Sequence, residues 1–181
     1  MRKPVDTVMV EQRANSFTRR SIKTASKEQG LRLALSMIDL TTLEGKDSPE
    51  KVRSLCAKAI LPWEGDIEPP LPSVAAVCVY PSLVQIAKRA LEGSTVAIAS
   101  VATGFPSGQY PIDVRLDDVT EAVKAGADEI DMVINRGAFL SGSFDEVANE
   151  ITRVREACGR AHLKIILETG ELETLENVRA A

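Results

Sequence analysis

Five short apolar runs, rich in β-branched residues, recur along the chain between segments of helical periodicity. Each run is nearly continuous in apolar character, which is typical of strands buried on both faces of a sheet. Strands of this kind that alternate with amphipathic helices indicate βα units and a parallel sheet. The predicted strands span residues 35–40, 74–80, 96–102, 129–134 and 163–168.

The segments between these runs carry helix start signals. Ser48 and Pro49 provide an N-cap followed by proline at the first helical position. Ser143 and Glu146 have the spacing of a capping box. Further helices are predicted after Pro81, after Ile112 and from residue 171 onward, and a proline-rich loop insertion is predicted over residues 63–73.

Consecutive βα units admit two architectures, an open doubly wound sheet or a closed (β/α)₈ barrel. The open sheet normally carries a glycine-rich phosphate turn after its first strand, and residues 40–45 contain none. The sequence therefore predicts an α/β fold of the TIM-barrel family, with about five βα units in residues 31–181. A basic, helical N-terminal extension is predicted over residues 1–30.

Composition and charge narrow the class of function. Residues 1–30 carry seven Lys or Arg against three acids, yet the whole chain has a net charge of −4 and only 4% aromatic residues. An acidic body with few aromatic side chains does not favour nucleic-acid binding. No stretch is apolar enough for a membrane helix or a secretory signal, so we expect a cytoplasmic protein without membrane or nucleic-acid partners.

Three charged residues interrupt the apolar runs: Asp39, Asp131 and Lys164. Side chains alternate across a strand, so each charge points away from its apolar neighbours and toward the barrel interior. Burying charges is costly unless they are paired, which makes chance placement of three a poor explanation. Two interpretations follow: a buried ion network that only supports the barrel, or a site for proton transfer and carbonyl chemistry.

Other candidates carry a weaker signal. Cys78 shares the inward parity, but a buried strand cysteine without a partner histidine is more often a small apolar residue than a nucleophile. His162, the single histidine, opens the fifth run and is expected at the surface. One histidine excludes a multi-histidine metal centre, and the cysteine spacing favours neither zinc nor disulfides. The segment 104–108 is either a turn or a loop that covers substrate.

At these residues the chain resembles deoxyribose-phosphate aldolase, the class I aldolase family of deoxyribonucleotide breakdown. The N-terminal extension and the 63–73 insertion resemble the longer-chain branch of that family. The matching segments, in family order, are residues 38–43, 75–81, 104–108, 126–135, 163–164 and 168–172.

The resemblance implies a (β/α)₈ barrel that reversibly cleaves 2-deoxy-D-ribose 5-phosphate to D-glyceraldehyde 3-phosphate and acetaldehyde. It implies a lysine Schiff base and no metal or organic cofactor. Asp131 matches the catalytic aspartate that moves protons. Asp39 and Lys164 match the charged network that supports it, and Thr41 and Cys78 match residues that line the substrate pocket.

The sequence departs from the family after the fifth run. The family's Schiff-base lysine lies on strand six, and its phosphate-binding glycines and serines follow strands six to eight, so we expect a chain truncated after strand five. Whole barrels of this class have about 250 residues. Three alternatives stay open: a non-catalytic fragment that self-associates through open sheet edges, another sugar-phosphate barrel lyase or isomerase, and a Schiff base on Lys164 itself.

Overall fold

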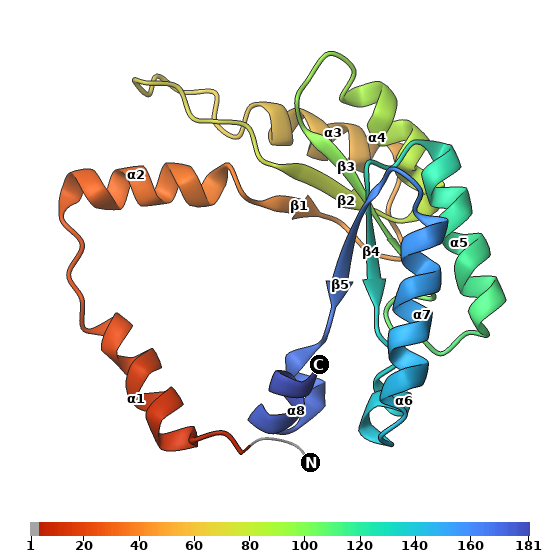
Figure 1. Ribbon diagram of the computed structural model, residues 1–181. Coiled ribbons are helices and arrows are strands. Elements are labelled where there is room, and N and C mark those ends of the chain that lie inside the picture. The colour runs from red at the N-terminus through yellow and green to blue at the C-terminus, as the bar shows by residue number, and fades with distance from the viewer. Residues whose placement is uncertain (1–3) are drawn as a thin grey trace.

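A computed structural model describes residues 4–181 and shows one parallel sheet with strands in the order β1-β2-β3-β4-β5 (Figure 1). Each strand pairs with the next strand along the chain, as βα units require. Among the described residues, β1 and β5 have one partner each and form the sheet edges. The strands are β1 (Asp39–Thr41), β2 (Ala76–Val79), β3 (Ala97–Ala102), β4 (Glu129–Val133) and β5 (His162–Ile166).

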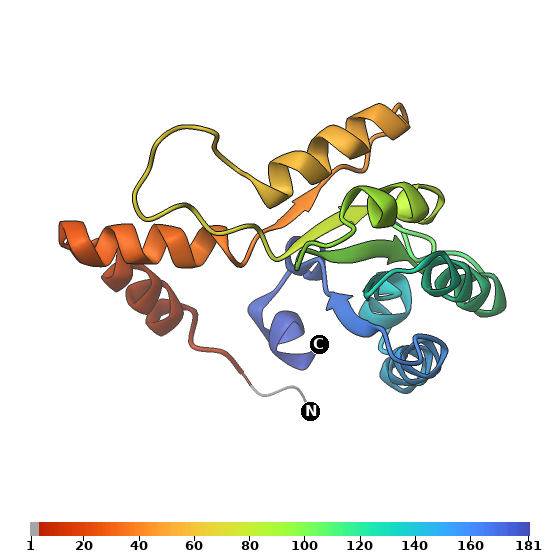
Figure 2. The ribbon, with the colours of Figure 1, turned by 90° about the horizontal axis from the view of Figure 1, so that it is seen from above.

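Helices follow the strands, and those that join one strand to the next lie along the outer side of the curved sheet (Figure 2). Ser48 caps its helix as predicted, because its hydroxyl accepts the Lys51 amide at 3.2 Å. Ser143 occupies the predicted N-cap position, but its side chain makes no capping hydrogen bond. The helices are α3 (Pro49–Ile60), η1 (Pro81–Leu83), α4 (Val84–Ala90), α5 (Ile112–Ala125), α6 (Arg136–Leu140), α7 (Phe144–Ala157), η2 (Thr169–Leu172) and α8 (Leu175–Ala180).

The first predicted strand, over residues 35–40, was placed too early. Leu35 is the last residue of a helix, and the amides of Met37 and Ile38 still donate to carbonyls of that helix. Pairing with β2 begins when the Ala75 amide reaches the Ile38 carbonyl, at 3.0 Å. Apolar character alone cannot separate a helix end from a buried strand, which explains the error.

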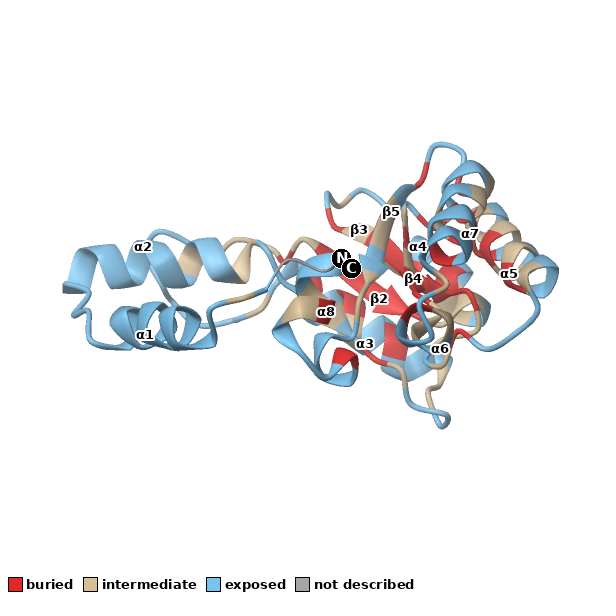
Figure 3. Ribbon diagram, turned by 60° about the horizontal axis from the view of Figure 1, so that its bottom comes forward, coloured by how far each residue is buried: buried red, intermediate tan, exposed pale blue. Residues whose placement is uncertain are grey.

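The N-terminal part of the chain forms two helices, α1 (Thr7–Thr18) and α2 (Thr24–Leu35), that stand away from the sheet (Figures 1 and 3). Every residue described within them is exposed or half-buried. The extension returns toward the C-terminal end of the chain, where the Val5 amide donates to Glu176 Oε1 at 3.0 Å. Because α2 runs past residue 30 without a break, the division at that residue stays a prediction.

The sheet separates two different layers of side chains. The outer layer is the main core, in which strand residues such as Val77, Ile130 and Met132 pack against helix residues such as Val52 and Val119. The inner layer holds a smaller cluster, formed by Ala76, Cys78, Ala99 and Val101. This is the arrangement of the TIM barrel, of which the chain supplies the first part. In residues 4–181 no helix is both long and apolar enough to cross a bilayer.

Candidate active site

The three charged residues predicted to face inward meet on the inner side of the sheet. Lys164 Nζ on β5 contacts the Asp39 carboxylate on β1 and lies 3.1 Å from Asp131 Oδ1 on β4. In the sheet register Asp131 lies beside Lys164, whereas Asp39 belongs to the opposite edge. The contact between side chains of the two edge strands therefore shows that the sheet is strongly curved.

Strand alternation explains this placement. Ile130 and Met132, which flank Asp131, are fully buried in the outer core. Leu163, which precedes Lys164, packs partly against the same core. Because neighbours on a strand point to opposite faces, the apolar residues anchor the strand and turn the charges inward.

Glu129 is a member of the cluster that the sequence reasoning missed. Its Oε2 lies 2.9 Å from Lys164 Nζ. Glu129 is the first residue of β4 and shares the parity of Asp131, two residues later. That parity is the signal in the sequence that indicates an inward-facing Glu129.

Cys78 and Thr41 lie beside the charged cluster at different depths. Cys78 is 2% exposed, and its thiol donates a hydrogen bond to Asp131 Oδ2 at 3.6 Å. Thr41 is paired with Cys78 in the sheet register but is exposed, and its hydroxyl donates to the Asp39 carbonyl at 3.0 Å. Cys78 therefore contacts the Asp131 carboxylate, and Thr41 lies at the open rim.

Burial sets the protonation of Asp131 and Cys78. Burial raises the pKa of the Asp131 carboxyl, although the positive charge of Lys164 opposes the change. Burial also raises the pKa of the Cys78 thiol to about 12, and the nearby negative charge of Asp131 adds to it. Asp131 can therefore gain and release a proton more readily near neutral pH than an exposed aspartate, and Cys78 stays a neutral thiol.

Lys164 is held in its charged form. Burial by itself would lower its pKa, but the hydrogen bonds that it donates to Asp39 and Glu129 and the negative charge of Asp131 together raise it. A nucleophilic amine must be neutral. The structure thus argues against the alternative in which Lys164 forms the Schiff base, because carboxylates surround it instead of another cation.

The remaining candidates lie around this cluster. His162 is exposed at the first residue of β5, as expected for the amino-terminal edge of the sheet. The segment 104–108 follows β3, and Phe105 packs against the inner cluster in edge contact with Tyr80, 6.5 Å between ring centroids. No group of three or more His, Cys, Asp or Glu within residues 4–181 is arranged to hold a metal ion.

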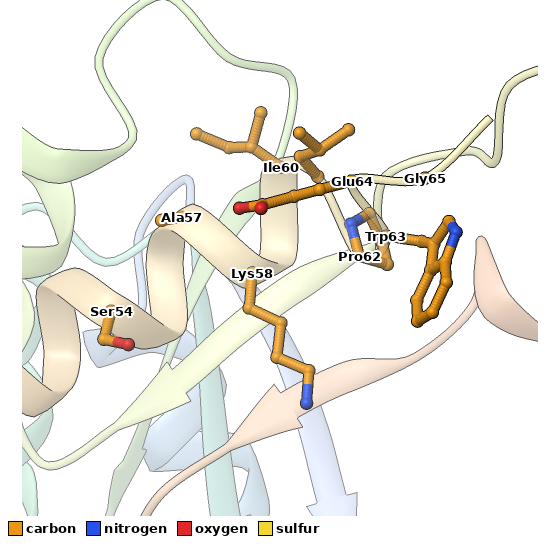
Figure 4. Close-up of a pocket in the computed structure, with 9 residues that line it drawn as sticks. Ser54, Ala57, Lys58, Ile60, Pro62, Trp63, Glu64 and Gly65 are labelled. Atoms are coloured by element: carbon orange, nitrogen blue, oxygen red, sulfur yellow. The ribbon is translucent and has the colours of Figure 1, made fainter.

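A large groove elsewhere on the molecule contains none of these residues. It lies at the end of α3 and the start of the following loop, where Figure 4 shows Lys58 and Trp63. Its lining comes from residues 54–65 alone. The charged cluster on the inner face is therefore the candidate active site.

Comparison with known proteins agrees with the fold. The model of the DeoC/LacD family of aldolases matches residues 33–178. The chain belongs to this family. Deoxyribose-phosphate aldolase of Mus musculus is 46% identical over 171 residues, and that of Homo sapiens is 45% identical. Each alignment covers 90% of this chain and 54% of the relative, so the chain spans about half the length of these relatives.

Solved structures of DeoC-type aldolases have the same fold. A putative deoxyribose-phosphate aldolase from Coccidioides immitis superposes with a TM-score of 0.72 at 30% identity, covering 82% of this chain and 54% of that one. The tetrameric deoxyribose phosphate aldolase from Aeropyrum pernix gives a TM-score of 0.60 at 25% identity, over 77% of this chain and 54% of that one. The DeoC chain described here thus forms part of a TIM barrel.

Proposed function

We propose that this chain provides the proton-transfer half of a class I aldolase site. The reaction proposed is the reversible cleavage of 2-deoxy-D-ribose 5-phosphate to D-glyceraldehyde 3-phosphate and acetaldehyde. Family membership supports the aldolase class, and the single observation that carries the site is the buried Asp131 carboxyl beside Lys164 and Cys78.

Asp131 is the proposed catalytic residue. Schiff-base aldol chemistry requires protons to be moved as the carbinolamine and enamine form and decay. A carboxyl whose pKa is raised by burial suits that task, because it exchanges protons closer to neutral pH. The proposed acceptors of its proton are ordered water and the substrate.

The neighbouring residues support Asp131 in three ways. The Lys164 ammonium, fixed by Asp39 and Glu129, stabilises the Asp131 anion after each proton is released. Cys78 and Thr41 are proposed to line the substrate pocket on either side of the cluster. The carbinolamine-forming amine is proposed to be a group other than Lys164, since Lys164 is held protonated.

The wider setting is part of the same proposal. We propose phosphorylated sugars and aldehydes as the ligands, a role in deoxyribonucleotide breakdown, a cytoplasmic location and assembly as a homo-oligomer. One observation favours the alternative of a self-associating fragment: most of the exposed large apolar side chains lie within residues 8–67 and include Phe17, Leu31 and Trp63. Contiguous exposed apolar surface often marks an interaction site.

Acetaldehyde release from 2-deoxyribose 5-phosphate tests the proposal when it is combined with borohydride trapping and mass spectrometry. Because this chain is proposed to supply only the proton-transfer half, release is measured in an assembly that also contains the amine-bearing half of the barrel. We expect substrate-dependent release there, and Asp131→Asn should abolish it. Asp117→Asn, which changes an exposed carboxylate on α5, serves as the matched control and should retain the wild-type rate. Retained activity in Asp131→Asn would remove the role assigned to Asp131.

Borohydride trapping distinguishes the proposal from a Schiff base on Lys164 and from a non-catalytic fragment. A borohydride adduct on Lys164 would contradict the assignment of that residue as a supporting cation. If the assembly that contains both halves of the barrel shows neither cleavage nor an adduct, the catalytic proposal fails. Concentration-dependent association, measured by light scattering, would then favour the self-associating fragment.

A further inference from the structure

Thr103, the residue that directly follows β3, has an unusual backbone conformation. Its φ is +66°, in the left-handed region, and its side chain is fully buried. A β-branched residue is disfavoured there, whereas glycine adopts the conformation without strain. A strained residue persists only where surrounding contacts hold it, so the Thr103 side chain must do something that glycine cannot.

The Thr103 hydroxyl accepts a hydrogen bond from the end of the neighbouring strand. The Val133 amide donates to Thr103 Oγ1 at 3.1 Å. Val133 is the last residue of β4, lies two residues after Asp131 and is fully buried. A buried amide that lost this acceptor would be unsatisfied, and leaving such a group unpaired is expensive.

The other backbone group of Val133 is also held by a side chain from a different element. Its carbonyl lies 3.5 Å from Nη2 of Arg115, a buried residue of α5. Just beyond β4 the chain packs closely against the loop after β3, because a Cβ on Gly108 would lie 3.1 Å from the Ile134 carbonyl oxygen. Thr103, Arg115 and the loop around Gly108 thus all contact the carboxyl end of β4 or the residue after it. Thr103 makes its contact from the position directly after β3.

We propose that Thr103 is a positioning residue of the site, whose hydroxyl fixes the end of β4 and thereby holds the Asp131 side chain between Lys164 and Cys78. The inference rests on the proposed role of Asp131, which must keep its carboxyl in place to carry protons. Displacements of about 1 Å in such a group reduce catalysis substantially. The strained backbone of Thr103 is maintained for this contact.

Ser100 shows that a buried hydroxyl on β3 does not necessarily form a hydrogen bond with β4. It is also fully buried, but its hydroxyl bonds to the carbonyl of Val101 in the same strand, at 3.1 Å. Ser100 therefore makes no hydroxyl contact that joins β3 to β4. Ser100→Ala is the matched control, since it removes a buried hydroxyl three residues earlier in the chain, on β3.

The test uses the full chain and two measurements by NMR: hydrogen exchange of the Val133 amide, and titration of the Asp131 carboxyl. Thr103→Val removes the hydroxyl at constant shape. Thr103→Gly removes the hydroxyl and also relieves the backbone strain, so it keeps the test valid if the valine variant fails to fold. Thr103→Ser retains the hydroxyl.

We expect exchange of the Val133 amide about tenfold faster in Thr103→Val and Thr103→Gly. In both variants the Asp131 pKa should fall toward its ordinary value, because water reaches the carboxyl and reduces the effect of burial. Lys164, Asp39 and Cys78 are the ionisable groups that face Asp131, and none of them is changed in these variants. Thr103→Ser should restore both properties, and Ser100→Ala should leave both unchanged. Wild-type exchange and an unmoved Asp131 pKa in Thr103→Gly would overturn the inference. Both measurements are independent of turnover, so failure of the proposed function would be seen separately.

Discussion

Lys164 on β5 and Asp39 on β1 form an ion pair although three strands lie between them in the sheet. Their contact closes the charged cluster across the concave inner face, where Glu129 and Asp131 also reach the same ammonium. Three carboxylates around one cation leave an excess of negative charge. The stability of this face should therefore depend on Lys164 more than on any single acid.

Lys164→Met tests that dependence. The variant leaves Asp39, Glu129 and Asp131 without their cation, and we expect the free energy of unfolding to fall by about 2 kcal/mol. The pKa of Lys164 is raised in the folded state, so its contribution is complete below the ordinary lysine pKa and disappears only as pH rises through the higher folded value. Urea unfolding between about pH 6 and 9 should show a constant difference.

Lys124→Met provides the control for that measurement. Lys124 pairs with Glu121 at 2.8 Å on the exposed surface of α5, where ion pairs contribute little. Its substitution should leave the urea midpoint nearly unchanged. An equal loss from the two lysine variants would contradict the assigned importance of the inner cluster.

Glu129→Gln tests whether the Glu129 carboxylate helps to raise the pKa of Lys164. Removing its charge takes away one of the interactions that raise the Lys164 pKa, so that pKa should decrease. NMR titration of the Lys164 Cε and Nζ signals measures the change. Glu121→Gln should lower only the pKa of Lys124, and an unmoved Lys164 in Glu129→Gln would contradict the geometry described.

Asp131 should make the free energy of unfolding fall as pH rises, whereas most aspartates in folded proteins make it rise. Its folded pKa is raised by burial, so the folded state binds its proton more tightly, and that contribution is lost as pH rises through the folded pKa. Asp131→Asn should therefore gain stability relative to wild type as the pH rises above the ordinary aspartate pKa and through the higher folded value. A difference that is independent of pH would show that the carboxyl has an ordinary pKa.

Cys78 should be unreactive toward alkylation in the folded chain. With a pKa of about 12 its thiolate is scarce at neutral pH, and its side chain is buried. In a background of Cys56→Ala and Cys158→Ala, the rate with iodoacetamide should keep rising up to about pH 10. The same chain in urea should react quickly and reach its plateau at the pKa of a free thiol, and rapid modification of the folded form would contradict the buried environment.

A buried ion pair joins α5 and α7 behind β4. Arg115 Nη1 lies 2.8 Å from Glu150 Oε2, and the arginine side chain is 1% exposed. Arg115→Met leaves Glu150 charged and unpaired, so we expect a loss of about 3 to 5 kcal/mol, which Glu150→Leu should largely restore in the double variant.

The same two helices supply the control. Arg153 and Asp113 pair at 2.9 Å on their exposed surface. Arg153→Met should change stability by less than about 1 kcal/mol. Thermal unfolding of the three variants distinguishes the buried pair from the exposed one, and similar losses at both pairs would contradict the burial of Arg115.

The sequence predicted the alternation of strands and helices because every central strand has a distinct apolar run. It also predicted that Asp39, Asp131 and Lys164 share a face, since Ile130 and Met132 define which side of β4 is apolar. The predicted start of β1 was wrong because the apolar residues there are equally compatible with the end of a helix, and they belong to the end of α2 and the turn after it. Thr103 could not have been found, because nothing in a threonine before a glycine reveals its backbone angle or its contact with Val133.

The two layers of side chains divide each strand into two sets of positions with separate tasks. Residues such as Ile130 and Met132 pack in the outer core with the helices, while their alternate neighbours Glu129 and Asp131 face inward and contact Lys164. Substitutions of the inward set can therefore alter reactivity without repacking the core. A lineage with this architecture can acquire new chemistry through every second residue of its strands while keeping the same scaffold.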